Sequence, residues 1–152
     1  MTTTGVRIRQ ARTKAGLTQA ELATRTRVHQ PSVSAYERGV SEPRPETLQR
    51  LLDAMKVRPS FILERHRLPV LAAAAAHRAS KVRVFGSAVH GTDTPESDID
   101  LLIHLDSGST LVDLVAFADE CETILGCPVD VVSDDALVGA IGRRITAEAV
   151  PL

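Results

Sequence analysis

The carboxylates of Asp98 and Asp100 stand one residue apart at the start of the apolar run DIDLLIHL. Side chains two positions apart in a strand project from the same face, so both carboxylates are expected on one side of a sheet. Like charges beside an apolar layer are costly unless a cation meets them. The pair therefore predicts a Mg²⁺ site, because hard divalent cations prefer carboxylate oxygens.

The pair Gly86-Ser87 ends the preceding apolar run, KVRVF, and ten residues separate it from Asp98. A glycine lets a phosphate approach the backbone closely, and a serine offers both a hydroxyl and an N–H. Gly86-Ser87 is therefore predicted to form a turn that binds nucleotide phosphates.

A third carboxylate, Asp130, lies in the stretch PVDVV, where Val129 and Val131 are expected to face the other way. If this strand pairs beside the one that carries Asp100, all three carboxylates converge. Three carboxylates next to a phosphate-binding turn suit two-metal nucleotidyl transfer. In this interpretation Asp98 and Asp100 bridge two Mg²⁺ ions. Asp130 completes the acceptor-side site and helps to deprotonate the nucleophile.

The elements that must position these residues form a small α/β (α+β) domain with a short mixed sheet, expected over residues 59–152. Hydrophobic periodicity predicts strands over 81–86, 99–105 and 128–133, and helices over 60–80, 109–126 and 134–150. Pro69 is expected to kink or split the first of these helices, and Ser133 to cap the last.

Residues 1–58 are expected to form a separate all-α domain that ends near the segment VRPS. Its predicted helices cover residues 6–16, 18–26, 29–39 and 46–56. Thr18 and Glu21 have the spacing of a capping box at the start of the second helix. A short turn joins the second helix to the third, which predicts a helix-turn-helix.

The charge is divided unequally between the two halves. Residues 1–58 hold 11 Lys and Arg against 5 Asp and Glu, whereas residues 59–152 hold 7 against 14. A net charge of +6 in the first half suits a polyanionic partner such as DNA.

The third helix of the basic half carries side chains that suit the major groove. Gln30 can pair with adenine, and Ala35 can meet a thymine methyl. The residues expected to contact bases or phosphates are Gln19, Gln30, Pro31, Ser32, Ser34, Ala35 and Arg38. An ion pair between Arg12 and Glu37 is predicted to tie the first helix to the third. The alternative is a helical interaction module that does not contact DNA.

The composition of the chain also predicts where in the cell the protein is found. The chain has 152 residues, 43% of them hydrophobic, and lacks both an apolar run of transmembrane length and the hydrophobic core of a signal peptide. These features predict a cytoplasmic protein without a membrane partner. Cys121 and Cys127 form no metal-binding pattern, so they are expected to be buried, reduced thiols.

Two stretches resemble known families. The segment LTQAELATRTRVHQPSVSAYERG resembles the Xre/Cro–C1 repressors over about residues 5–58, with Arg27 at a turn position often held by glycine. The segment GSAVHGTDTPESDID fits the GS-x10-DxD pattern of the DNA polymerase beta-like nucleotidyltransferases. Together with LERHR, LGCPVDVV and RRITAEAVPL, it is similar to the minimal, MNT-type members over about residues 62–152.

The second resemblance implies an antitoxin of the MNT–HEPN toxin–antitoxin systems, which transfers AMP from ATP to a tyrosine of a HEPN ribonuclease toxin. The first implies a dimer on a pseudo-palindromic operator, and hence repression of the antitoxin's own operon. The expected partners are operator DNA and a HEPN-type toxin, in a homodimer or a hetero-oligomer with the toxin.

Two other functions remain open from the sequence. The nucleotidyltransferase domain could be catalytically inert and neutralise its partner by contact alone. It could also nucleotidylate a small molecule, as aminoglycoside-modifying relatives do, although 152 residues shared with a repressor domain leave no separate substrate-binding domain.

Overall fold

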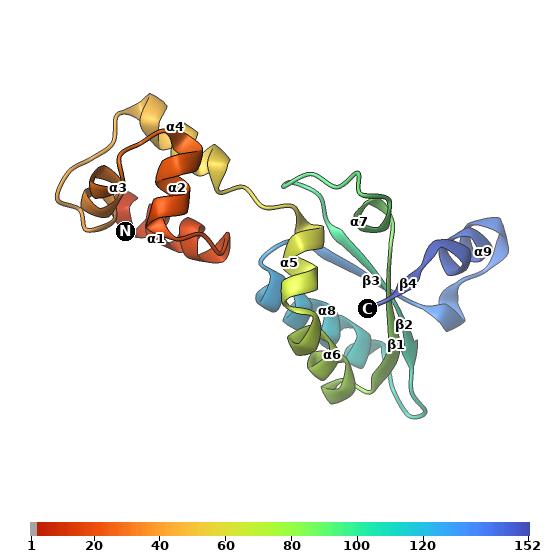
Figure 1. The fold of residues 1–152 in the computed structure, drawn as a ribbon. Coiled ribbons are helices and arrows are strands. Elements are labelled where there is room, and N and C mark those ends of the chain that lie inside the picture. Colours follow the sequence, from red (N-terminus) through yellow and green to blue (C-terminus); the bar gives the residue numbers. More distant parts are fainter. Residues whose placement is uncertain (1–2) are drawn as a thin grey trace. The chain divides into compact units, whose positions relative to one another are not determined.

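A computed structural model describes residues 3–152 of the chain. The chain divides into two compact units, Met1–Val57 and Arg58–Leu152 (Figure 1). In the described residues, no helix is both long and apolar enough to cross a bilayer.

The first unit consists of the helices α1 (Thr4–Lys14), α2 (Gln19–Thr26), α3 (Gln30–Glu37) and α4 (Pro45–Ala54). Helix α2 begins at the expected capping box, because Thr18 accepts from the backbone N–H of Glu21 and the Glu21 carboxylate accepts from that of Thr18. Arg27 ends α2 with a φ of 55°, in the left-handed region. The predicted helix-turn-helix is confirmed.

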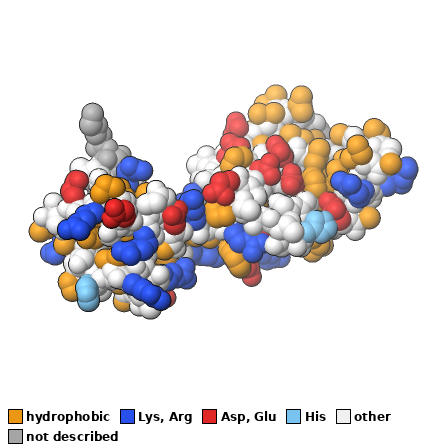
Figure 2. Space-filling view, turned by 90° about the horizontal axis from the view of Figure 1, so that it is seen from above, with side chains coloured by type: hydrophobic (Ala, Val, Ile, Leu, Met, Phe, Trp, Pro, Cys, Tyr) orange, Lys and Arg blue, Asp and Glu red, His pale blue; other side chains and the backbone are white. Residues whose placement is uncertain are grey.

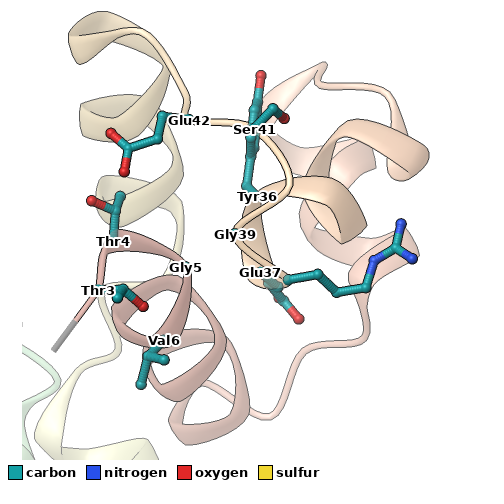
Figure 3. Close-up of a pocket in the computed structure, with 10 residues that line it drawn as sticks. Thr3, Thr4, Gly5, Val6, Tyr36, Glu37, Gly39, Ser41 and Glu42 are labelled. Carbon is teal, nitrogen blue, oxygen red and sulfur yellow. The ribbon is translucent and has the colours of Figure 1, made fainter.

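The core of the first unit holds the four helices together. Fully buried side chains from all four meet there, namely Ile8, Leu22, Val33 and Leu51. Gly5 is needed where α1 crosses the end of α3, because a Cβ at Gly5 would overlap the carbonyl oxygen of Tyr36. Figure 3 shows Gly5 of α1 close to Tyr36 and Glu37 at the end of α3, and these residues help to line a pocket of about 260 Å³.

The second unit is an α/β domain built on a four-stranded mixed sheet with the strand order β3-β2-β1-β4. Strand β1 pairs antiparallel with β2 and β4, and β2 pairs parallel with β3. Its elements are α5 (Pro59–Arg65), α6 (Arg67–Ala76), β1 (Ala79–Phe85), α7 (Ser87–His90), β2 (Ile99–Leu105), α8 (Leu111–Leu125), β3 (Val129–Ser133), α9 (Gly139–Glu148) and β4 (Val150–Pro151). The expected fold class, helices followed by a small mixed-sheet domain, is confirmed.

Strand β2 is the centre of this unit. Four of the first five residues of β2 are apolar with no exposed surface, namely Ile99, Leu101, Leu102 and Ile103. Helices α5, α6 and α8 pack against one another beside the sheet, and α9 lies on the other side of the strands (Figure 1). Phe117 and the free thiol of Cys121 are buried side chains of α8. The expected burial is confirmed for Cys121 but is wrong for Cys127, which is half-buried.

The helix predicted over 60–80 is split, as expected from Pro69, but its predicted end is wrong. It is broken at His66 into α5 and α6, and it ends at Ala76 because β1 already begins at Ala79. Pro69 occupies the third position of α6, where a missing N–H costs little. Its ring would clash with the carbonyl of Arg65 in a continuous helix, which explains a break one turn before the proline.

The helix predicted over 134–150 is also wrong in its extent. A 3-10 turn, Asp134–Ala136, follows β3, and α9 begins only at Gly139. Ser133 does not cap either element, and its buried hydroxyl has no hydrogen-bond partner among the described residues. The end of the predicted helix forms the additional strand β4.

Candidate active site

The three predicted carboxylates come together at one end of the sheet. Asp98 immediately precedes β2, Asp100 is its second residue, and Asp130 is the second residue of β3. Asp100 and Asp130 are register partners across the parallel pair β2–β3. One carboxylate oxygen from each of the three lies within 4.8 Å of the others. The geometry therefore suits a shared cation.

Electrostatics at this cluster also favour a cation. Burial, followed by the negative charges of Asp98, Asp130 and Glu148, raises the pKa of Asp100 to about 6. A cation among these oxygens would remove the repulsion and supply the ligands that Mg²⁺ prefers. The chemistry of the donor set therefore fits a divalent metal ion.

The Gly86-Ser87 turn lies directly against this cluster. Gly86 follows β1, whose last residue, Phe85, is paired with Asp100. Its φ of 73° and ψ of −148° fall in a region that is essentially restricted to glycine. A Cβ at Gly86 would overlap the Oδ2 atom of Asp100. Glycine is therefore what lets the turn and the carboxylate occupy adjacent positions.

A fourth carboxylate, Glu148, reaches the same turn from the last residue of α9. Its Oε1 accepts from the backbone N–H of Gly86 at 3.4 Å, and its Oε2 lies 3.1 Å from Nε2 of His90. Sequence reasoning missed this residue. The only sequence signal was its place in the RRITAEAVPL stretch, and the pairing of β4 with β1 is what brings it to the turn.

The loop between the turn and Asp98 is fixed by an ion pair that was not predicted, between the buried carboxylate of Asp93 and the partly exposed guanidinium of Arg58. The side chain of Asp93 has no exposed surface and accepts from Arg58 Nη2 at 2.7 Å and from the backbone N–H of Ser60 at 2.9 Å. Burial opposes ionisation, but the hydrogen bonds from Ser60 and Arg58 hold the pKa of Asp93 below its ordinary value. This contact anchors the loop that leads into β2.

A second group of possible metal ligands lies elsewhere in the unit. One ligand atom each from His104, Asp134 and Asp135 lies within 4.8 Å of the others. The carboxylate of Asp134, however, already accepts from Arg83 Nη2 at 3.1 Å and contacts Nδ1 of His104 at 3.0 Å. Because Arg83 neutralises this carboxylate, the group is an ion-pair network.

In the first unit, the predicted ion pair between α1 and α3 is confirmed. Arg12 donates to both carboxylate oxygens of Glu37, from Nε at 2.6 Å and from Nη2 at 3.0 Å. Gln19 also donates to Glu37 at 2.9 Å, and Gln30 donates to Gln19 at 3.0 Å. Burial opposes the ionisation of Glu37, but these bonds from Arg12 and Gln19 lower its pKa.

The side chains expected to contact DNA lie on or beside α3. The exposed ones are Gln30, Pro31 and Arg38. The half-buried ones are Gln19, Ser32, Ser34 and Ala35. In this DNA-free chain the amide of Gln19 is occupied by Glu37 and Gln30. The network therefore orients the Gln30 side chain at the start of α3.

The two units match two protein families. Residues 8–62 match the helix-turn-helix family, and residues 73–149, about half of the chain, match the nucleotidyltransferase domain family. The resemblances to a helix-turn-helix and to a nucleotidyltransferase domain are thereby confirmed.

Individual relatives are similar to the second unit. A protein of Methanocaldococcus jannaschii that bears the name of a protein adenylyltransferase is 35% identical over 88 residues, which are 58% of this chain and 91% of that protein. Protein adenylyltransferase MntA of Thermococcus cleftensis is 30% identical over 70 residues, which are 46% of this chain and 71% of that protein. A solved structure described as a minimal nucleotidyltransferase is 38% identical with a TM-score of 0.57, covering 61% of this chain and 95% of that chain.

Proposed function

The chain belongs to the nucleotidyltransferase family, and we propose that its second unit transfers AMP from ATP to a hydroxyl group of a partner protein. The observation that carries this proposal is the meeting of three carboxylates with the Gly86-Ser87 turn. The names of the two relatives support the adenylyl group as the one transferred.

The proposed reaction is an in-line displacement at the α-phosphorus. The acceptor oxygen forms a bond to this phosphorus while the bond to the pyrophosphate oxygen breaks, so the products are the adenylylated protein and pyrophosphate. Mg²⁺, when bound, would neutralise the charge that builds up on the phosphates. Asp98 and Asp100 would hold the metal ions, and Asp130 would accept the proton of the acceptor hydroxyl and release it to water.

Gly86 and Ser87 are proposed to bind the phosphates of ATP. Gly86 supplies a backbone N–H that already donates to an anionic partner in the structure, the carboxylate of Glu148. Ser87 adds its hydroxyl beside this N–H. Backbone N–H groups in such turns form concave anion sites, which suits the triphosphate end of a nucleotide.

The proposed acceptor is a tyrosine of a HEPN-type ribonuclease toxin, so that the chain acts as the antitoxin. The similarity to relatives named protein adenylyltransferases, and the MNT-type sequence pattern, support a protein acceptor. Residues 58–152 hold 14 Asp and Glu against 8 Lys and Arg, so this unit suits a partner with a basic surface.

The first unit is proposed to bind operator DNA as a homodimer or within a hetero-oligomer with the toxin. Gln30 at the start of α3 and Arg38 directly after its end are exposed, as base and phosphate contacts require. Residues 1–57 hold 10 Lys and Arg against 5 Asp and Glu, and this net charge of +5 supports a polyanionic partner. An antitoxin with such a unit would repress its own operon.

The chemistry is tested by incubating the chain with the partner toxin, ATP and Mg²⁺ and measuring the intact mass of the toxin. We expect the toxin to gain the mass of AMP, and expect no gain with Asp98→Asn/Asp100→Asn or in EDTA. Asp119→Asn, which alters an exposed carboxylate of α8, is the matched control and should transfer normally.

A toxin of unchanged mass with the wild-type chain would contradict the proposal. If the double variant still neutralises the toxin in cells, neutralisation occurs by contact and does not need transfer. A shift in the migration of operator DNA, lost in Gln30→Ala/Arg38→Ala, tests the role of the first unit.

A further inference from the structure

The carboxylate of Glu148 accepts a hydrogen bond from the backbone N–H of Gly86. In the proposed function this N–H binds a phosphate of ATP. Oε1 of Glu148 accepts from the Gly86 N–H at 3.4 Å, which is near the outer limit for a hydrogen bond. Such a long contact is weak, so an incoming anion can replace it. Glu148 therefore stands where a triphosphate oxygen would bind.

This position of Glu148 is fixed by the backbone that follows it. Ala149 donates to the carbonyl of Ile145, Val150 pairs with Val84 of β1, and Leu152 donates to the carbonyl of Val82 at 3.0 Å. Glu148 ends α9 directly before these contacts. The backbone of Glu148 is therefore held beside the turn by a strand and does not depend on a freely moving helix end.

His90 holds the other oxygen of the same carboxylate. Nε2 of His90 lies 3.1 Å from Oε2 of Glu148, and the His90 side chain is 55% exposed while that of Glu148 is 21% exposed. Oε1 can leave Gly86 while Oε2 stays against His90, because the two contacts use different oxygens. The contact with His90 can therefore keep the Glu148 carboxylate beside the turn when a phosphate binds to the Gly86 N–H.

Glu148 also adds negative charge to the three-carboxylate cluster. It is one of the three acidic groups whose charge acts on Asp100, together with Asp98 and Asp130. A triphosphate without a cation would meet four carboxylates and be repelled. A triphosphate that carries a divalent cation brings the charge that these carboxylates require.

We propose that Glu148 is a specificity-determining residue that competes with phosphate for the Gly86 N–H and so admits ATP only as its complex with a divalent cation. This inference rests on the proposed function, because it takes the Gly86-Ser87 turn as the phosphate site. It assigns Glu148 no role in the transfer step itself.

The test compares the affinity for ATP in Mg²⁺ and in EDTA, measured by calorimetric titration of the full chain. We expect wild-type chain to bind ATP in Mg²⁺ and at least about 100-fold more weakly in EDTA. Glu148→Gln keeps the shape of the side chain but removes its charge. It should bind metal-free ATP about 10-fold more tightly than wild type, and change the affinity for Mg²⁺-bound ATP less than about 3-fold.

Two further variants make the result specific to this position. Glu148→Ala, which removes both the charge and the acceptor, should improve the binding of metal-free ATP at least as much as Glu148→Gln. Glu64→Gln removes one exposed carboxylate of α5 in the same unit and should leave both affinities unchanged. Equal gains from Glu64→Gln and Glu148→Gln would reduce the effect to general electrostatics and overturn the inference.

The failure of the inference can be distinguished from failure of the proposed function. If Glu148→Gln and Glu148→Ala bind metal-free ATP no better than wild type while Mg²⁺-bound ATP still binds, only the inference is wrong. If they lose binding of Mg²⁺-bound ATP, Glu148 supports the ligand and does not compete with it. If the wild-type chain does not bind ATP in Mg²⁺, the proposed function and the inference both fail.

Discussion

Asp100 on β2 and Asp130 on the parallel strand β3 are register partners, and their carboxylates meet at the same end of the sheet. Side chains alternate between faces along a strand, so a slip of one residue in this pairing would turn Asp130 to the opposite face. The hydrophobic partners on either side fix the register, since Ile99 pairs with Val129 and Leu101 with Val131. The core of the unit thereby determines the geometry of the cluster.

Asp100→Asn is expected to stabilise the metal-free second unit while abolishing its response to Mg²⁺. Asp100 is crowded by other carboxylates, so removal of its charge relieves repulsion. We expect a gain of roughly 1 kcal/mol in the free energy of unfolding, reduced by solvent because this side chain is partly exposed. Thermal unfolding with and without Mg²⁺ measures both effects.

In that experiment, wild-type chain should rise in melting temperature when Mg²⁺ is added, and Asp100→Asn should not. Asp119→Asn is the control for loss of a carboxylate outside the cluster and should retain the rise. An Asp100→Asn variant that is less stable in EDTA and still responds to Mg²⁺ would rule out a cation site at this cluster.

Gly86→Ala is expected to impair both the fold of the turn and the transfer. The backbone of Gly86 lies in a glycine-specific region, and a Cβ would overlap the Asp100 carboxylate. We expect a loss of about 1–3 kcal/mol in the free energy of unfolding and at least about a 10-fold loss of transfer. Urea unfolding and the mass-based transfer assay provide the two measurements.

Gly108→Ala is the matched control. Gly108 also has a positive φ, of 84°, but a Cβ there would meet nothing within 4 Å. This variant should lose about 1 kcal/mol of stability from backbone strain alone and transfer AMP at the wild-type rate. Equal transfer by Gly86→Ala and Gly108→Ala would show that the close approach of Asp100 is irrelevant to function.

Local sequence patterns predicted the features that depend only on residues close together in the chain. The capping box of Thr18 and Glu21 lies within four consecutive residues, and it forms as predicted. The sequence pattern also predicts that Gly86 follows one strand and that Asp98 and Asp100 stand at the start of the next, and both positions are confirmed.

The parts that sequence reasoning missed depend on distant segments. Strand β4 has only two residues, too few for a period of two to be visible, so Val150 was assigned to a helix. Glu148 meets Gly86 across 62 positions of sequence only because β4 pairs with β1. Asp93 lies in a polar loop, and its burial follows from the docking of Arg58 and Ser60.

Glu37→Gln is expected to destabilise the first unit. The Glu37 side chain is 3% exposed and accepts from Arg12 and Gln19, so the variant leaves the Arg12 guanidinium without its negative partner. We expect a loss of about 2 kcal/mol in the free energy of unfolding. Hydrogen exchange of amides in α1 and α3 would report this loss separately from the second unit.

The same substitution should also weaken DNA binding, because Glu37 orients Gln19, which in turn holds Gln30. Glu42→Gln, at an exposed position of the same unit, is the control and should change neither quantity. If Glu37→Gln retains wild-type exchange rates in α1 and α3, the ion pair contributes nothing to the stability of this unit.

The stabilisation from Asp93 is expected to depend on pH. In the folded chain the pKa of Asp93 is below its ordinary value, whereas in the unfolded chain it is about 4. The stabilisation is therefore complete at pH values above the pKa of the unfolded chain. It is lost as the pH falls from there through the lower, folded pKa. Asp93→Asn removes the ionisable group, and we expect it to cost about 2 kcal/mol at about pH 7.

The pH dependence separates the ion pair from simple packing. The difference in unfolding free energy between wild type and Asp93→Asn should shrink as the pH is lowered to about 3, because protonated Asp93 then resembles asparagine. Urea unfolding followed through amides of the second unit at a series of pH values measures this difference. Other carboxylates titrate in both proteins and cancel in the comparison. A difference that stays constant with pH would mean that Asp93 stabilises the loop by shape and hydrogen bonding, without a contribution from its charge.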